Sequence, residues 1–252
     1  MLGYYSSLSS EVYDLDKPIG SSFGDIEYYQ ERLKGHKGPI LEPAAGTGRM
    51  LIPLLEEGFE VEGFDLSEEM LKHCEENCRI RGLHPKLFVD RMETFKTDKR
   101  YEAIIIPTGT FLLLHDRKQS IQALTNFFHH LADGGKFIVD LIFEPNIEIG
   151  KISTRTWTSQ NNDTITLEHK KVELDWIHQF SVSHNRYERW RKGSLIESEL
   201  ERISIRWYGV DEFKDILEKV GFTDISVSAD YVYGKAPTDA SQVLTFEAVV
   251  NK

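Results

Sequence analysis

The sequence predicts an α/β fold: a doubly wound, mostly parallel sheet of seven strands, into which a separate antiparallel β-sheet is inserted. Three observations carry this prediction. Short apolar runs alternate with helical segments between residues 38 and 143. One run, Tyr101–Pro107 (YEAIIIP), is typical of a strand buried on both faces of a parallel sheet. From residue 152 to 206 the pattern changes to polar–apolar alternation with period 2, which indicates antiparallel strands.

The strands and helices follow one another in a regular order. The expected strands are 40–41, 61–67, 86–90, 101–107, 136–143, 223–233 and 243–250. The expected helices are 25–34, 49–57, 68–81, 116–133 and 210–222. Gly35 and Gly58 stand where helices end, the fourth helix is expected to stop at Gly134-Gly135, and Ser67 is placed to cap the third helix. Residues 1–23 show no clean period.

These elements divide the chain into three parts. We expect an N-terminal helical or cap segment (1–37), an α/β domain made of 38–150 and 207–252, and an inserted antiparallel β module (151–206). The module differs in composition from its surroundings, because Trp157, Trp176, Trp190 and Trp207 all lie in it or directly after it. It also carries ten Lys and Arg against eight Asp and Glu, whereas the chain as a whole has a net charge of −11.

Composition excludes several classes of protein. The 252 residues are 40% hydrophobic and 28% charged, which is ordinary for a globular chain and unlike a disordered or fibrous one. No run approaches the roughly 18 apolar residues of a membrane span, and the N-terminus lacks the pattern of a signal peptide. Two cysteines, Cys74 and Cys78, indicate reduced thiols in a cytoplasmic protein. The acidic charge disfavours binding to duplex nucleic acid.

The strongest functional signal is the turn after the first strand. It reads Glu42-Pro43-Ala44-Ala45-Gly46-Thr47-Gly48-Arg49, and Gly46 and Gly48 there leave bare backbone against which a ligand can lie at a helix N-terminus. Asp65 follows at the end of the second strand, beside this turn in a doubly wound sheet, where a carboxylate can accept both hydroxyls of a ribose. Taken alone, these residues are also explained without a ligand, as two glycines required by a turn and an aspartate that caps a helix.

Two further strand ends strengthen the signal. Asp90, Arg91 and Met92 end the third strand, where a carboxylate can accept from an adenine amino group and Met92 can contact the ring. Pro107-Thr108-Gly109-Thr110-Phe111 ends the fourth strand, and its glycine allows close approach of a ligand. Four successive strand ends therefore line one groove of nucleoside size.

With these motifs the chain resembles the class I S-adenosylmethionine-dependent methyltransferases, over about residues 38–141 and again from about 206 to the C-terminus. Ala44 stands where many members have the first glycine of the motif. The resemblance implies a Rossmann-like methyltransferase fold and S-adenosylmethionine as cofactor. More narrowly, Tyr13-Asp14, Asp140–Pro145 and Arg206–Tyr208 resemble a small-molecule branch with a β insert after strand five.

The resemblance also assigns residues to the cofactor. They are Glu42, Ala44, Gly46, Gly48, Arg49, Asp65, Leu66, Met70, Asp90, Arg91, Met92, Pro107, Thr108 and Phe111. Within this set, Glu42 is implied to meet the ammonium group of the methionine end and Arg49 its carboxylate.

Three other functions remain to be weighed. A nicotinamide-dependent dehydrogenase also uses a glycine-rich turn, but Leu51 stands at the third glycine and Glu42 would repel a pyrophosphate. A non-catalytic binding or partner protein on the same fold stays open. An enzyme that methylates nucleic acid is disfavoured, because the fourth strand ends in Pro107–Thr110 and not in the Asn/Asp-Pro-Pro-aromatic motif.

The predicted reaction is an in-line displacement at a sulfonium methyl by a nucleophile of a small-molecule acceptor. The catalytic residue is left unassigned; weak candidates on the acceptor side are Tyr5, Tyr13, Asp140 and Arg206. Cys74, Cys78 and His73 lack a second pair of ligands, so no metal is predicted. No membrane partner is expected, a homodimer stays open, and the accepting atom (N, O, S or C) is not assigned.

Overall fold

A computed structural model describes residues 5–252 and contains two separate β-sheets. The larger sheet has seven strands in the order β10-β11-β5-β4-β1-β2-β3. Its strands are β1 (Ile40–Pro43), β2 (Val61–Asp65), β3 (Leu87–Val89), β4 (Tyr101–Ile106), β5 (Leu131–Ile142), β10 (Thr223–Ala229) and β11 (Val243–Val249). The first five strands pair in parallel, whereas β11 runs antiparallel to both β5 and β10. The predicted seven-stranded, mostly parallel sheet is thus confirmed.

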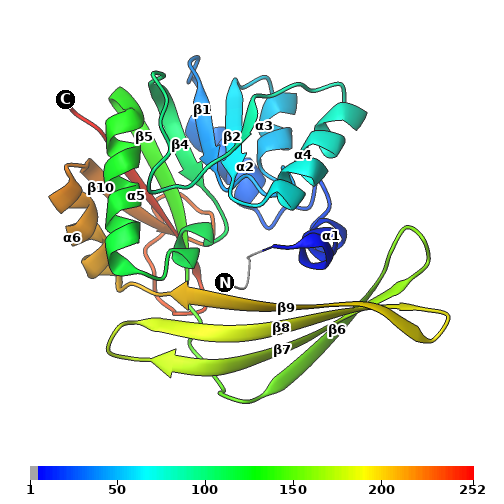
Figure 1. Cartoon of the computed structure of the whole chain (residues 1–252). Coiled ribbons are helices and arrows are strands. Elements are labelled where there is room, and N and C mark those ends of the chain that lie inside the picture. The colour runs from blue at the N-terminus through cyan, green and yellow to red at the C-terminus, as the bar shows by residue number, and fades with distance from the viewer. Residues whose placement is uncertain (1–4) are drawn as a thin grey trace.

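Helices cover both faces of this sheet, as expected for a doubly wound fold (Figure 1). The helices of the described residues are α1 (Ser7–Asp16), α2 (Asp25–Leu33), α3 (Leu51–Glu56), α4 (Glu68–Ile80), the 3-10 turn η1 (Thr110–Leu113), α5 (Arg117–His130) and α6 (Val210–Val220). Side chains of α2, α3 and α4 pack in one apolar cluster with the sheet, and those of α5 and α6 pack in another. The sheet is therefore buried on both faces, which explains the apolar composition of β4.

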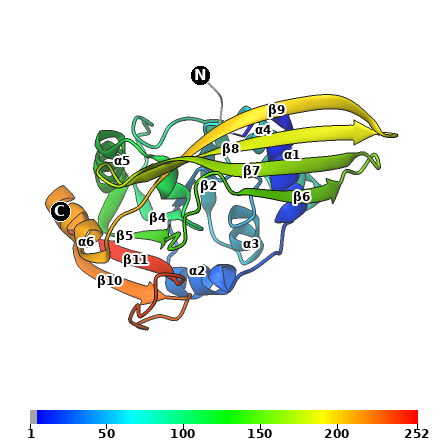
Figure 2. The same cartoon turned by 90° about the horizontal axis from the view of Figure 1, so that it is seen from below.

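The smaller sheet has four antiparallel strands in sequence order. They are β6 (Ile152–Thr158), β7 (Thr164–Asp175), β8 (Phe180–Arg191) and β9 (Ser194–Arg206). This confirms the antiparallel sheet predicted from the period-2 pattern. The strands run beneath the seven-stranded sheet in Figure 1 and extend across the molecule when it is seen from below in Figure 2. Helix α1 contacts both α4 and the strands β6 and β8, so it lies between the two sheets.

One expectation about local structure was wrong. Helix α5 does not stop at Gly134-Gly135 but ends at His130, and β5 begins directly afterwards at Leu131. The glycines instead form an irregularity inside the strand pairing, where the Gly134 N–H donates to the Val250 carbonyl. Residues 7–16, within a segment that showed no period, form α1 because Leu8 and Val12 pack against the smaller sheet. Residues 1–4 of the predicted 1–37 segment lie outside the described residues.

Candidate functional site

A cavity of about 670 Å3 opens at the carboxyl ends of the parallel strands. Residues from the ends of four successive strands line it: Ala44 and Gly46 after β1, Asp65 and Leu66 after β2, Asp90 to Glu93 after β3, and Thr110 after β4. Met70 of α4 and Arg202 of β9 also line it. We call it the first cavity. The four strand ends that the sequence analysis singled out are thus brought together in one place.

The turn after β1 has an unusual backbone that suits small residues. Ala44 adopts a left-handed conformation with φ +55°, which explains why the resembling family often has glycine there. Gly48 has φ +88°, and an added Cβ would lie 2.9 Å from the Cys74 sulfur. Gly48 is therefore required for the close packing of the turn against α4. It does not itself line the cavity.

Asp65 joins the ends of β1 and β2. Its carboxylate accepts a hydrogen bond from the Gly46 N–H at 2.9 Å and another from the Ser67 N–H at 2.8 Å. Burial raises the pKa of Asp65, and the backbone N–H groups of Ser67 and Gly46 oppose that rise. A carboxylate oxygen can accept more than one hydrogen bond, so the side chain keeps acceptor capacity toward the cavity.

Five residues assigned to the cofactor do not line the first cavity or the second one described below: Glu42, Gly48, Arg49, Pro107 and Phe111. The Arg49 guanidinium forms a buried ion pair with Asp25 and donates to the Ser21 carbonyl at 3.0 Å. Its positive charge is thus engaged by the first residue of α2 and by the segment before that helix. Phe111 is fully buried and packs against Tyr208 and Phe213.

Glu42 is a buried carboxylate with unused acceptor capacity. Its Oε2 atom has no hydrogen-bond partner among residues 5–252. Burial raises the pKa of Glu42 well above its usual range, although the nearby Arg49 opposes the effect. Such an orphaned acceptor is uncommon in a folded protein, so this position suits a donor that comes from a ligand.

Asp140, a weak catalytic candidate from the sequence, lines neither cavity and is fully buried. Its carboxylate accepts from the hydroxyls of Tyr29, Tyr231 and Thr245 and from the Thr108 N–H at 2.7 Å. Burial raises its pKa to about 6. Thr108 has φ +54°, a strained conformation for a β-branched residue, and the bond from Asp140 holds it there. In this structure Asp140 positions the turn after β4.

A second cavity of about 530 Å3 lies between the two sheets, beside the turn after β4. Thr108 and Arg206 line it, as do Ile142 and Phe143 at the end of β5. Residues of the smaller sheet close its other side, namely His169, Lys171, Ser181, Ser183, Asn185, Ile203 and Ile205. Sequence reasoning placed Arg206 near the acceptor but did not find the residues of β7 and β8, because only the strand register brings them together.

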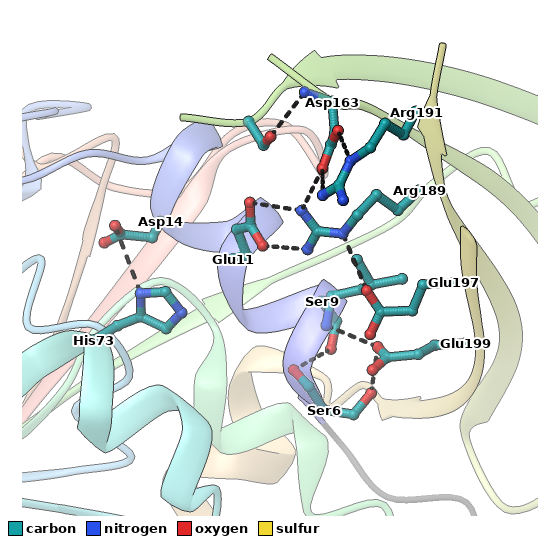
Figure 3. Close-up of polar contacts among 12 residues, drawn as sticks. Ser6, Ser9, Glu11, Asp14, His73, Asp163, Arg189, Arg191, Glu197 and Glu199 are labelled. Carbon is teal, nitrogen blue, oxygen red and sulfur yellow. Dashed lines mark hydrogen bonds and ion pairs between the residues drawn. The ribbon is translucent and has the colours of Figure 1, made fainter. Parts of the chain in front are cut away.

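The N-terminal segment closes the first cavity from the side of α1. Tyr5 and Tyr13 line the cavity, and their rings meet edge to face with centroids 5.9 Å apart. Contacts with the smaller sheet and with α4 fix this segment, as Figure 3 shows: Glu11 of α1 pairs with Arg189 of β8, and Asp14 pairs with His73 of α4. The placement of Tyr5 and Tyr13 thus depends on the inserted strands as well as on the α/β domain.

His115 also lines the first cavity, although the sequence analysis assigns it no role. Burial lowers the pKa of its ring, so the neutral imidazole can accept a proton there. The neighbouring Asp116 caps α5 by accepting from the Lys118 and Gln119 N–H groups. Within residues 5–252, no group of three or more His, Cys, Asp and Glu is placed to hold a metal ion, and no helix is long and apolar enough to cross a membrane.

Comparisons with known proteins agree with this geometry. Residues 40–135 match the family described as a methyltransferase domain. The chain is 28% identical over 219 residues to "Putative methyltransferase YqeM" of Bacillus subtilis (strain 168). The aligned region covers 86% of this chain and 85% of that protein. The chain therefore carries a methyltransferase domain and is similar to the class I S-adenosylmethionine-dependent methyltransferases. The predicted family and its cofactor, S-adenosylmethionine, are thereby confirmed.

Solved structures confirm the fold of this methyltransferase. An S-adenosylmethionine-dependent methyltransferase from Clostridium acetobutylicum ATCC 824 superposes with a TM-score of 0.78 at 17% identity, over 96% of this chain and 97% of that one. The sugar N-methyltransferase KedS8 from Streptoalloteichus superposes with a TM-score of 0.74 at 19% identity, over 100% and 98% of the two chains. The likeness extends over both sheets, so the fold includes the inserted strands.

Proposed function

We propose that this methyltransferase transfers a methyl group from S-adenosylmethionine to a small-molecule acceptor by in-line displacement. The observation that carries the proposal is the first cavity, which lies at the ends of four successive parallel strands. The glycine-rich turn, the buried carboxylate of Asp65 and the residues after β3 and β4 line it together. In this proposal, the α/β domain (38–150 and 207–252) binds the cofactor, and the inserted β module (151–206) covers the acceptor.

The lining of the first cavity fits the cofactor. Asp65 would accept from the ribose hydroxyls and Asp90 from the adenine amino group, and Met92, Leu66 and Met70 offer apolar surface to the ring. Glu42 does not line the cavity but lies two residues before Ala44, which does, and we assign its orphaned Oε2 to the ammonium group. Arg49 is not proposed for the cofactor carboxylate, because Asp25 and the Ser21 carbonyl engage its two terminal nitrogens and the residue lines neither cavity, although its buried Nε has no partner among residues 5–252.

When bound, S-adenosylmethionine supplies an activated methyl group. The chain's own residues would then align the acceptor and exclude water. Tyr5 and Tyr13 shield one side of the first cavity, and the strands of the smaller sheet close the second cavity beside it. His115 is placed to take a proton if the accepting atom carries one. The protein's part in the reaction is therefore to align the acceptor, to exclude water and, where the accepting atom carries a proton, to remove it.

Calorimetry tests the binding step. S-adenosylmethionine and S-adenosylhomocysteine should each bind with a dissociation constant of micromolar order. Saturable binding of NAD with no response to S-adenosylhomocysteine would reject the proposal. Incubation of the enzyme with methyl-labelled cofactor and a metabolite mixture, followed by mass spectrometry, then tests transfer. Cofactor binding without any labelled product would favour a non-catalytic binding protein on the same fold.

A further inference from the structure

We propose that the second cavity is the acceptor site and selects an organic anion, whose negative group is bound by Lys171. This inference rests on the proposed function, because it names the class of substrate that the methyltransferase takes. The ligand would carry an apolar body and one carboxylate or phosphate. Four features of the cavity lead to it.

The first feature is the opposite charge balance of the two cavities. The first cavity is lined by four carboxylates and two guanidinium groups: Asp65, Asp90, Glu93, Asp116, Arg91 and Arg202. The second is lined by two cationic side chains, Lys171 and Arg206, and one carboxylate, Glu144. An excess of carboxylates suits a cationic sulfonium cofactor. The excess of positive charge next to it suits an anionic acceptor.

The second feature is the burial of Lys171. Its side chain is only 8% exposed, and its Nζ donates to the Ser181 hydroxyl at 3.3 Å and pairs with Glu144. An ammonium group taken out of water is costly unless an anion and hydrogen-bond acceptors surround it. Lys171 therefore requires a negatively charged partner at its ammonium group.

The third feature is the position of that partner. Glu144 lies on the segment between β5 and β6, not in a strand, and its side chain is 54% exposed. A carboxylate so exposed can return to water at little cost, whereas Lys171 cannot follow it. Glu144 thus occupies the place at which the anionic group of a ligand would meet Lys171.

The fourth feature is the rest of the lining. One wall is polar: the His169 Nδ1–H donates to the Asn185 Oδ1 at 2.8 Å, and Ser181 and Ser183 stand beside them on β8. The rest of the lining is apolar: Ile203 and Ile205 of β9, which pair with Ser183 and Ser181, and Ile142, Phe143, Trp176 and Trp207. The volume of about 530 Å3 is that of a small-molecule site. An apolar ring with one charged substituent matches this arrangement.

Three probes that share one ring test the inference: benzoate, phenyl phosphate and neutral benzamide, titrated into the full chain with S-adenosylhomocysteine present. At least one anion should bind about tenfold or more tightly than benzamide, because only an anion can replace Glu144 at Lys171. The preference between benzoate and phenyl phosphate distinguishes a carboxylate acceptor from a phosphorylated one.

Four variants locate the effect. Glu144→Gln should strengthen anion binding about three- to tenfold, since it removes the competing carboxylate, and should leave benzamide unchanged. Lys171→Met should abolish the preference for the anion, and Lys171→Arg should keep most of it. Lys170→Met is the matched control, because Lys170 neighbours Lys171 on β7 but does not line the cavity. It should change nothing.

Several results would overturn the inference. Equal binding of benzoate, phenyl phosphate and benzamide would do so, as would the absence of saturable binding by either anion. Equal losses in Lys171→Met and Lys170→Met would also reject it. S-adenosylhomocysteine binding, measured in the same samples, tests the proposed function separately. A chain that binds an anion through Lys171 but not S-adenosylhomocysteine would overturn the proposed function and keep the anion site.

Discussion

The two sheets of this protein are held in place by different forces. The seven-stranded sheet is covered by helices on both faces, and large clusters of buried apolar side chains lie on each side of it. The four-stranded sheet shares only one small apolar cluster with α1, formed around Leu8, Val12, Ile165 and Tyr187. Its other links to α1 are ion pairs and hydrogen bonds, many of which appear in Figure 3.

Because of this difference, we expect the α/β region to hold a fixed geometry and the inserted sheet to rearrange more easily. Buried, fully satisfied polar groups such as Asp140 give the cofactor region one well-defined backbone, because any rearrangement leaves several donors unpaired. Ion pairs at a partly exposed surface cost less to rearrange. We therefore expect the α/β region to set cofactor geometry and the inserted sheet to be the part that varies with the acceptor. Comparing variants in the two regions tests this view.

The largest effect is expected at Asp140 in the α/β region. Asp140→Ala removes the acceptor of four donors in a fully buried site and should lower the free energy of unfolding by about 3–5 kcal/mol. Glu168→Ala, which removes a carboxylate from the inserted sheet, should cost less than about 1 kcal/mol, because its pair with Arg186 is partly exposed. Urea denaturation measures both. Similar costs at the two positions would contradict the comparison.

Asp140 should also give the stability a pH dependence. Burial raises its pKa to about 6, so the folded chain retains a proton that the unfolded chain releases near pH 4. The stabilising contribution is fully present below the unfolded pKa and is lost as the pH rises through about 6. The difference in unfolding free energy between wild type and Asp140→Asn should therefore fall over this range. A difference that stays constant with pH would refute the shift.

The next effect is expected at Asp65, in cofactor binding. Asp65→Ala should weaken S-adenosylhomocysteine by about 1.5–3 kcal/mol, because two hydrogen bonds to a charged acceptor are lost. Calorimetry measures the affinity, and circular dichroism checks that the chain stays folded. Asp98→Ala, at an exposed position outside both cavities, is the control. Unchanged affinity in a folded Asp65→Ala variant would reduce Asp65 to a structural residue of the turn.

The sequence predicts the α/β region well because its signals are local. Apolar runs, the glycine-rich turn and Asp65 each follow from a few consecutive residues, and the strand order then brings them together. Ala44 and Asp90 to Met92 are found in the first cavity for the same reason. The left-handed backbone at Ala44 explains a motif position that the sequence alone presents as a departure.

Long-range contacts account for what the sequence does not predict. The partner of Arg49 is Asp25, which lies 24 positions earlier in the chain and outside any motif. Phe111 follows a strand end but turns into the core because Tyr208 and Phe213, about a hundred residues later, surround it. Likewise, no local pattern places Lys171 in a cavity, since that depends on the register of three antiparallel strands.

The smallest effect is expected where the two regions meet, at Arg189 on β8. Its side chain is 12% exposed and pairs with Glu11 of α1 and with Glu197 at 3.0 Å (Figure 3). Arg189→Ala should lower the unfolding free energy by about 1–2 kcal/mol, because it leaves partly buried carboxylates unpaired. Arg186→Ala, on the same strand but 50% exposed, should cost less than about 1 kcal/mol.

Hydrogen exchange makes this last prediction specific to the contact between the regions. In Arg189→Ala the amides of α1 should exchange faster, and those of β1 and β4 should not, because the helices that cover these strands do not depend on Glu11. Affinity for S-adenosylhomocysteine should fall only a few-fold, through the loosened Tyr5 and Tyr13, and so by less than in Asp65→Ala. If α1 keeps its protection, or if β1 and β4 lose theirs as well, the two sheets are held as one unit and the acceptor region is no more adaptable than the cofactor region.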